Sequence, residues 1–152
     1  MNLDTSPILL VEDNEDDVFL MQRALQSAGI INPFLLVEDG QQAVDYLSGA
    51  GPYSDRASYP LPSVVFLDLK LPYKSGHEVL QWIRGNKTLD GLIVVVLTSS
   101  NEPHDIKQCY SLGANSYVVK PPTPEQLDDL AKAFKGYWLK FNAFENPAEV
   151  EK

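Results

Sequence analysis

Four polar residues stand at or just beyond the ends of short apolar runs: Asp13, Asp68, Thr98 and Lys120. The runs are rich in leucine and β-branched residues and lie at 7–11, 64–67, 92–97 and 117–119. Two carboxylates, a hydroxyl and an ammonium group suit a divalent cation and a phosphoryl group, because oxygen ligands hold Mg²⁺ and cations neutralise phosphoryl oxygens. The residue types predict this chemistry, provided that the fold brings them together.

The apolar runs resemble the strands of a parallel sheet. Short continuous apolar runs bounded by polar, Gly or Pro residues are typical of strands buried on both faces. A further run of this kind lies at 34–37. In open parallel sheets, ligands bind outside the carboxyl ends of the strands, so residues that are distant in the sequence converge there.

Five segments with helical periodicity alternate with these strands. They lie at 15–28, around 43–47, at 76–84, from 103 to about 113, and at about 124–139. The alternation predicts an α/β fold: a doubly wound five-stranded parallel sheet flanked by five helices. If the strand order is 2-1-3-4-5, the switch point lies between the strands that end at Asp13 and Asp68. The connection at 48–62 is long enough to be either functional or an insertion.

Composition narrows the class of function. The chain has 152 residues and 44% hydrophobic content, which suits one compact domain. Its 12 basic and 21 acidic residues give a net charge of −9, which disfavours nucleic acid and anionic membranes as partners. The single cysteine, Cys109, cannot close an intrachain disulfide, and the first residues lack the pattern of a secretion signal. We therefore expect a cytoplasmic location.

The acidic residues predict a magnesium site. Glu12, Asp13 and Asp68 at one sheet edge would repel one another and raise at least one pKa unless a cation intervenes. Mg²⁺ usually takes one or two carboxylates and a phosphate oxygen and keeps several waters. An ionised aspartate can itself act as a nucleophile, and Asp68 is the candidate because it directly follows the central run. Lys120 would supply the counter-charge and the Thr98 hydroxyl a hydrogen bond.

Each of these residues also has an ordinary explanation when it is taken alone. Glu12 and Asp13 could complement the dipole of the first helix, and Asp68 could be a solvated loop acid. Thr98 opens a run that could cap a helix, and Lys120 could be a surface lysine. Their joint placement, each at the end of its own strand, favours a shared chemistry.

Four motifs, in this order, are similar to those of bacterial two-component response regulators, specifically the receiver domain of the chemotaxis-regulator type. They are Leu-Leu-Val-Glu-Asp-Asn at 9–14, Val-Val-Phe-Leu-Asp-Leu-Lys-Leu-Pro at 64–72 with Ser75 and Gly76 after it, Val-Val-Leu-Thr-Ser at 95–99, and Gly-Ala-Asn-Ser-Tyr-Val-Val-Lys-Pro at 113–121. The resemblance runs from Pro7 to about Leu139 and implies the flavodoxin-like receiver fold.

The resemblance implies roles for the residues of the site. Asp68 would accept a phosphoryl group from the phosphohistidine of a sensor histidine kinase, and Asp13 and Asp68 would bind Mg²⁺ directly. Glu12 would act through water, and the backbone carbonyl of Lys70 would complete the protein ligands. Receivers often carry two aspartates where this chain has Glu12 and Asp13, and glutamate is a familiar variant there.

The resemblance also implies a switch. The Thr98 hydroxyl would move toward the phosphoryl group and the Tyr117 ring would turn inward, whereas the ordinary role of Tyr117 is to pack against the fourth helix. Lys70 and Ser100 lie near the path of an attacking water and would tune the lifetime of the phosphorylated form. The bond between Lys120 and Pro121 resembles a cis peptide of the family, which would aim the ammonium inward.

A narrower resemblance is to the small regulators paired with phytochrome-type photoreceptor kinases. It rests on Val-Glu-Asp-Asn-Glu-Asp-Asp at 11–17, the long loop before the third strand, and Gly-Tyr-Trp-Leu at 136–139. This resemblance implies a red-light-sensing kinase as partner.

Residues 1–152 are predicted to form a single receiver domain with a core at about 7–139. The extension at 140–152 is too short for a DNA-binding or enzymatic output domain. Output would then pass through a surface that another protein, or a second copy of this chain, reads after phosphorylation.

Two surfaces are candidates for a homodimer. Tyr137, Phe141 and Phe144 form an aromatic stripe if the last helix continues past residue 139, and this stripe either packs back on its own domain or pairs two copies. The face of the fourth helix and fifth strand is the alternative.

The sequence favours a phosphoacceptor switch that catalyses only its own phosphorylation and slow dephosphorylation over three other functions. A phosphatase of the haloacid dehalogenase type needs an acid two residues after the nucleophile, where this chain has Lys70. A nucleotide-binding domain is disfavoured because neither glycine-rich phosphate-binding motif is present. A receiver that only binds proteins is disfavoured because every acceptor residue is in place.

Overall fold

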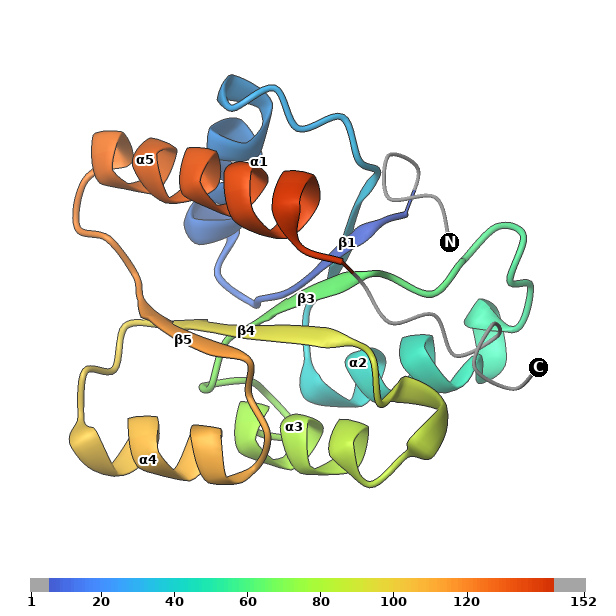
Figure 1. Cartoon of the computed structure of the whole chain (residues 1–152). Helices are drawn as coiled ribbons and strands as arrows, with labels where there is room; N and C mark the ends of the chain where they lie inside the picture. The colour runs from blue at the N-terminus through green and yellow to red at the C-terminus, as the bar shows by residue number, and fades with distance from the viewer. Residues whose placement is uncertain (1–5, 144–152) are drawn as a thin grey trace.

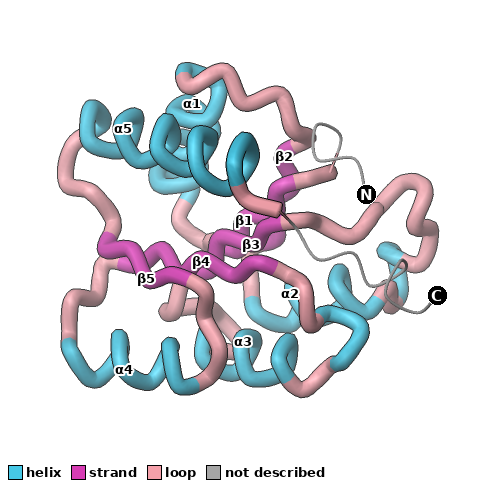
Figure 2. Tube along the Cα trace, in the orientation of Figure 1, coloured by secondary structure: helices cyan, strands magenta, loops and turns pink. Residues whose placement is uncertain are grey.

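The computed structural model describes residues 6–143, which form one five-stranded parallel sheet with the strand order β2-β1-β3-β4-β5. The strands are β1 (Ile8–Val11), β2 (Phe34–Val37), β3 (Val64–Leu67), β4 (Ile93–Thr98) and β5 (Ser116–Val119). In the register, Ile8 of β1 lies opposite both Phe34 and Val64, so the three strands end side by side (Figure 2). The predicted fold class and strand order are confirmed.

Five α-helices flank the sheet. They are α1 (Glu15–Ser27), α2 (Gly40–Ser48), α3 (Gly76–Arg84), α4 (Pro103–Ser111) and α5 (Pro124–Phe134). Helices α1 and α5 cover one face, while α2, α3 and α4 cover the other (Figure 1). Within residues 6–143, no helix is both long and apolar enough to cross a membrane.

The last helix differs from the prediction of one regular helix to residue 139. The α-helical winding ends at Phe134 and a π-helix, η3 (Lys135–Phe141), continues it. Tyr137 and Phe141 of the predicted stripe are 58% and 75% exposed, so most of each side chain is open to solvent. Phe144 lies outside the described residues.

Side-chain caps start four of the helices near the carboxyl edge of the sheet. The capping residues each accept a hydrogen bond from a backbone N–H in the first turn, and they are Asn14, Asp39, Ser75 and Thr123. Helix N-termini carry partial positive charge. The fold therefore directs several positive helix ends toward the edge at which the predicted acids lie.

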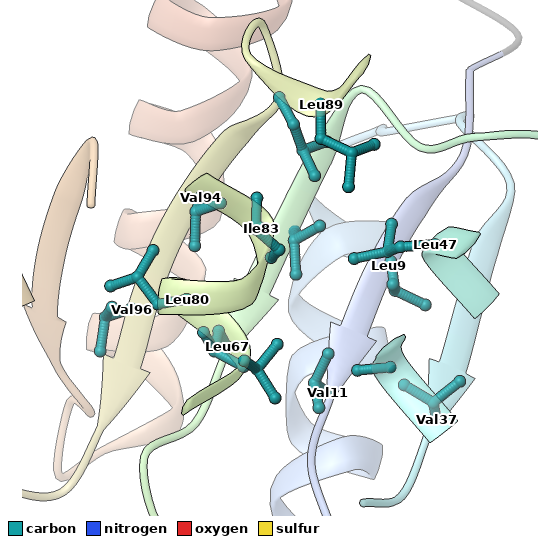
Figure 3. Packing of buried hydrophobic residues seen from close by; sticks show 14 of the residues in the cluster. Leu9, Val11, Val37, Leu47, Leu67, Leu80, Ile83, Leu89, Val94 and Val96 are labelled. Carbon is teal, nitrogen blue, oxygen red and sulfur yellow. The ribbon is translucent and has the colours of Figure 1, made fainter. Parts of the chain in front are cut away.

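The core consists of two apolar layers, one on each face of the sheet. Leu9 and Val11 point into the layer under α2 and α3, where Leu80 and Ile83 meet them (Figure 3). Their neighbours on β1 point into the layer under α1 and α5. Every residue of β1 and β3 is buried, which explains why these strands are continuous apolar runs in the sequence.

The long loop between α2 and β3 is ordered around Arg56. Its guanidinium donates hydrogen bonds to the carbonyl oxygens of Tyr46 and Leu47, both at 2.8 Å, and of Tyr59 at 3.1 Å. The ring of Tyr53 packs between those of Tyr46 and Tyr59, with centroid distances of 5.1 and 5.3 Å. Arg56 thus caps the carboxyl end of α2 and holds the loop against it.

Candidate functional site

The predicted acids converge at the carboxyl edge of the sheet. Glu12 and Asp13 follow β1 and Asp68 follows β3, and one carboxylate oxygen of each lies within 4.8 Å of the others. Glu12 and Asp68 are only 3% and 7% exposed, whereas Asp13 faces solvent. The Asp68 N–H donates to the Val11 carbonyl at 3.1 Å, so sheet hydrogen bonding itself places this carboxylate beside the pair on β1.

Lys120 points into this acidic cluster. Its Nζ lies 2.5 Å from Glu12 Oε1, 2.7 Å from Asp17 Oδ2 and 3.3 Å from Asp68 Oδ2. An ammonium group has three N–H donors, and all three have a carboxylate partner here. The backbone N–H of Lys120 also donates to the Thr98 carbonyl at 2.7 Å, which fixes where the side chain leaves β5.

Asp17 is the functional residue that the sequence reasoning missed. It lies in the first turn of α1, where its N–H donates to the Asn14 side chain at 3.0 Å. The signal was available, because a helix that begins directly after the acidic pair must set its first turn at the same sheet edge. The pattern alone does not show that Lys120 reaches this far.

The predicted cis peptide between Lys120 and Pro121 is wrong. No peptide bond in the described part of the chain is cis. The ammonium points inward nevertheless, because three carboxylates attract it and the lysine side chain is long enough to reach them from a trans peptide.

The charges of the cluster shift two pKa values. The pKa of Glu12 is raised to about 7: burial contributes most to the rise, the hydrogen bond from Lys120 opposes it, and the nearby Asp68 adds to it. Burial lowers the pKa of Lys120, but hydrogen bonds to Asp17 and Glu12 outweigh it and raise the pKa above its ordinary value. One ammonium is therefore not enough to keep all the acids fully ionised at neutral pH.

The donor set fits a hard divalent cation. Three carboxylates from Glu12, Asp13 and Asp68 offer oxygen atoms at close range, and oxygen is the ligand that Mg²⁺ and Mn²⁺ prefer. A bound cation would also favour the ionised form of Glu12, whose pKa burial and the nearby Asp68 raise. Asp13 is the exposed member, so the cluster is open on its solvent side.

The backbone packs tightly behind Asp68. Asp68 Oδ1 accepts a hydrogen bond from the Leu69 N–H at 2.7 Å, and Oδ2 faces the ammonium of Lys120. At Gly76, a Cβ atom would lie 2.2 Å from the Asp68 carbonyl oxygen, so only glycine fits where α3 begins. Lys70 is exposed two residues after Asp68.

Thr98 and Tyr117 both contact Ser100, one residue of the loop between β4 and α4. The Thr98 hydroxyl is buried and accepts from the Ser100 N–H at 3.5 Å. The Tyr117 hydroxyl donates to the Ser100 carbonyl at 2.9 Å, and the Ser100 hydroxyl donates to Asp105 of α4 at 2.6 Å. The predicted switch pair is thus joined through Ser100, while the switching itself stays a prediction.

Comparison with known families accounts for this arrangement. The sequence model of the response regulator receiver domain matches residues 8–132. The chain belongs to the response regulator receiver family. The receiver is a signalling switch of two-component phosphorelays, and the motifs that pointed to it carry Glu12, Asp13, Asp68, Thr98 and Lys120.

Individual relatives narrow the resemblance. The receiver is 39% identical over 141 residues to the probable methanogenesis regulatory protein FilR2 of Methanothrix harundinacea, covering 93% of this chain and 88% of FilR2. It is 35% identical to the response regulator Rcp1 of Synechocystis sp., covering 88% of each chain. A crystal structure of the phosphorylated cyanobacterial phytochrome response regulator RcpA matches with a TM-score of 0.86 at 35% identity, over 93% of this chain and 99% of RcpA.

A second solved structure bears on the acidic cluster. The Mn²⁺-bound form of Rcp1 matches with a TM-score of 0.84 at 33% identity, over 93% of this chain and 99% of that one. The similarity to small phytochrome-associated response regulators is confirmed. A divalent cation at the carboxyl edge agrees with both the family and the three carboxylates of this receiver.

Proposed function

We propose that this receiver accepts a phosphoryl group on Asp68 from the phosphohistidine of a sensor histidine kinase, in a reaction that requires Mg²⁺. The observation that carries the proposal is the contact of Lys120 with Asp68 beside the two acids of β1. An aspartate with a purely structural role would need only a partner of its own. Asp68 instead shares the Lys120 ammonium with Glu12, and it lies at the edge where sheets of this type bind ligands.

The proposed transfer forms one O–P bond on Asp68 and breaks one N–P bond of the donor. An Asp68 carboxylate oxygen attacks phosphorus, the N–P bond of the donor breaks, and the imidazole leaves with its electron pair and takes up a proton. Bound Mg²⁺ would neutralise charge on the phosphoryl oxygens, held by Asp13, Asp68 and the Lys70 carbonyl, with Glu12 acting through water. Lys120 exchanges its long 3.3 Å contact with Asp68 for a phosphoryl oxygen while Glu12 and Asp17 keep it in place.

The phosphoryl group then acts on the switch residues. The Thr98 hydroxyl turns from the Ser100 N–H toward the new oxygen, and Tyr117 gives up its bond to the Ser100 carbonyl and moves inward. Ser100, which also holds Asp105 of α4, passes the change to the surface. Lys70 and Ser100 tune the lifetime of the acyl phosphate through the approach of water. The receiver has no substrate but itself.

The partners follow from the relatives and from exposed surface. Because RcpA is a phytochrome response regulator, we propose a phytochrome-type kinase as donor. Phosphotransfer from a panel of kinases tests this, and equal transfer from red-light-sensing and other kinases would reject it. Such a donor draws its phosphoryl group from ATP, which places the reaction in the cytoplasm. Residues 6–143 would act together as a single receiver domain.

A homodimer is the proposed form of output. Tyr137 and Phe141 present exposed rings, and Tyr110 and Val119 expose apolar surface on α4 and β5 at 49% and 41%. Sedimentation with and without a phosphoryl mimic tests this, and a monomer in both states would remove it.

Acetyl phosphate with Mg²⁺ provides the deciding test of the acceptor. Intact mass should show one added phosphoryl group on the wild type and none on Asp68→Asn, because an amide is not a nucleophile at this position. Chelation of the metal should abolish the gain. Phosphorylation of Asp68→Asn at the same rate would sink the proposal.

A further inference from the structure

The loop between β3 and α3 leaves the acceptor and returns to it. The Gly76 N–H donates to the Leu69 carbonyl at 2.9 Å, so both ends of the loop lie beside Asp68. Tyr73 stands near the middle of the loop, and there the Lys74 N–H donates to the Pro72 carbonyl at 2.9 Å. The loop is therefore short, closed by hydrogen bonds, and attached at its base to the phosphoacceptor.

Tyr73 holds an unfavourable backbone conformation. Its φ is +66°, and it is the one residue other than glycine with positive φ in the stretch that the structure describes. A hydrogen bond across three residues with positive φ at the centre is the rare, strained form of γ-turn. Glycine or asparagine would be expected at such a position, since a bulky side chain there is a genuine outlier.

The surroundings keep Tyr73 in this conformation. The Pro72 carbonyl also accepts from the Gly40 N–H at 3.3 Å. A Cβ at Gly40 would lie 2.0 Å from the Lys74 carbonyl oxygen, so α2 begins in close contact with the loop. Strain that the surroundings enforce in this way clusters at functional sites, and the inference runs from the outlier to the function.

The strained residue gains nothing from its own domain. The Tyr73 side chain is 87% exposed, more than any other large apolar side chain between residues 6 and 143. Its hydroxyl has no hydrogen-bond partner among those residues, and Tyr73 lines an open hollow with Gln41 and Gln42. Tyrosine is a preferred anchor residue of protein interfaces, because it offers a large rigid contact with a polar tip.

We infer that Tyr73 is a docking residue for the phosphodonor protein and sets which donor this receiver accepts. This rests on the proposed function. A donor that brings phosphohistidine to Asp68 from outside the sheet meets the loop that starts and ends there. The donor surface beside its histidine must offer an apolar pocket for the ring. It must also offer carboxylates for Lys70 and Lys74, which flank Tyr73 in a chain of net charge −9.

Two donors of different size separate docking from chemistry. Phosphoramidate carries the same N–P bond as phosphohistidine but makes no contact with the loop. The protein donor is the autophosphorylated kinase that phosphorylates the wild type fastest in the panel above. Tyr73→Asn removes the ring and relieves the strain, while Tyr73→Phe keeps the ring. Ile31→Asn is the control, because Ile31 is 79% exposed and lies before β2, at the opposite edge of the sheet.

Tyr73→Asn should lower kcat/KM for transfer from the kinase by about tenfold, as loss of an interface anchor does. Its phosphoramidate rate should stay within about twofold of the wild type and its Tm should rise, because asparagine tolerates positive φ. Tyr73→Phe should recover most of the transfer, and Ile31→Asn should match the wild type with both donors.

Three results would overturn the inference. Undiminished transfer from the kinase to Tyr73→Asn would show that the ring makes no contact. An equal loss with both donors would assign Tyr73 to the chemistry of the loop. A panel in which no kinase phosphorylates a wild type that reacts with phosphoramidate would remove the donor itself. A wild type inert to phosphoramidate would instead overturn the proposed function.

Discussion

Lys120 and Arg56 each gather three oxygen partners, but the partners differ in kind. Lys120 binds carboxylates of Glu12, Asp17 and Asp68, which lie just after β1, in α1 and just after β3. Arg56 binds only backbone carbonyls, at the end of α2 and in the loop that follows it. One cation joins charged groups that compete for it, and the other binds neutral backbone carbonyl oxygens at a helix end.

The difference separates a site that responds from one that holds structure. A phosphoryl oxygen can replace a carboxylate at Lys120, because both are anions that accept a hydrogen bond. No ligand can replace the carbonyls at Arg56 without unwinding the end of α2. Mutations at Lys120 should therefore change chemistry, and mutations at Arg56 should change stability.

The largest expected effect is at Lys120. Lys120→Met should slow phosphorylation by acetyl phosphate about 100-fold, the usual loss when one charge-stabilising donor is removed from a reacting centre. The rate is measured by intact mass over time. Lys135→Met is the matched control, because Lys135 donates to the Ala28 carbonyl away from the acids. Equal rates for the two variants would break the comparison.

A smaller effect, confined to stability, is expected at Arg56. Arg56→Met should lower the free energy of unfolding by about 2 kcal/mol, since buried carbonyls lose a charged donor. Urea unfolding followed by circular dichroism measures this, and the exposed Arg23→Met serves as control. The phosphorylation rate should stay unchanged, and a loss of rate larger than the fraction unfolded would contradict the separation.

The smallest expected effect is a change of stability with pH at Tyr46, the residue whose carbonyl binds Arg56. Burial raises the pKa of Tyr46, whose hydroxyl donates to the Pro60 carbonyl at 2.7 Å, from 10.0 to about 12. Because the folded-state pKa is raised, the stabilisation is complete below pH 10 and is lost toward pH 12, by about 1.4 kcal/mol per pH unit. Tyr46→Phe should be about 1 kcal/mol less stable than the wild type at pH 8.

Above pH 10 the stability difference between Tyr46→Phe and the wild type should shrink and then reverse. Urea unfolding at pH 8 and pH 11 measures both differences. A constant difference would mean that the Tyr46 hydroxyl titrates as freely in the folded protein as in the unfolded one.

The sequence predicted best what burial on both faces controls. Asp68 was found because β3 is an apolar run that is buried along its whole length. Lys120 was found because β5, although only partly buried, is also an apolar run, and the carboxyl ends of parallel strands share one edge. The bounds of α3 were also predicted correctly, from the helical spacing of apolar residues over 76–84, and the structure adds a capping box at Ser75.

The features that were missed depend on reach and tertiary packing. Asp17 is one acid among several in the first turn of α1, and only the path of the Lys120 side chain selects it. Arg56 gives no periodic signal, because its three partners are backbone atoms of an irregular segment. The change from α-helix to π-helix after Phe134 also gives no sequence signal, since the apolar spacing of 124–139 suits a regular helix.

That change of winding matters to anyone who joins a reporter protein to this receiver. A π-helix turns less per residue than an α-helix, so every side chain after Lys135 is rotated from the azimuth that α5 would give it. A rigid fusion designed as a continuation of the α-helix α5 would therefore give the reporter protein the wrong orientation relative to the receiver. The phase should be taken from η3, whose last residue is Phe141.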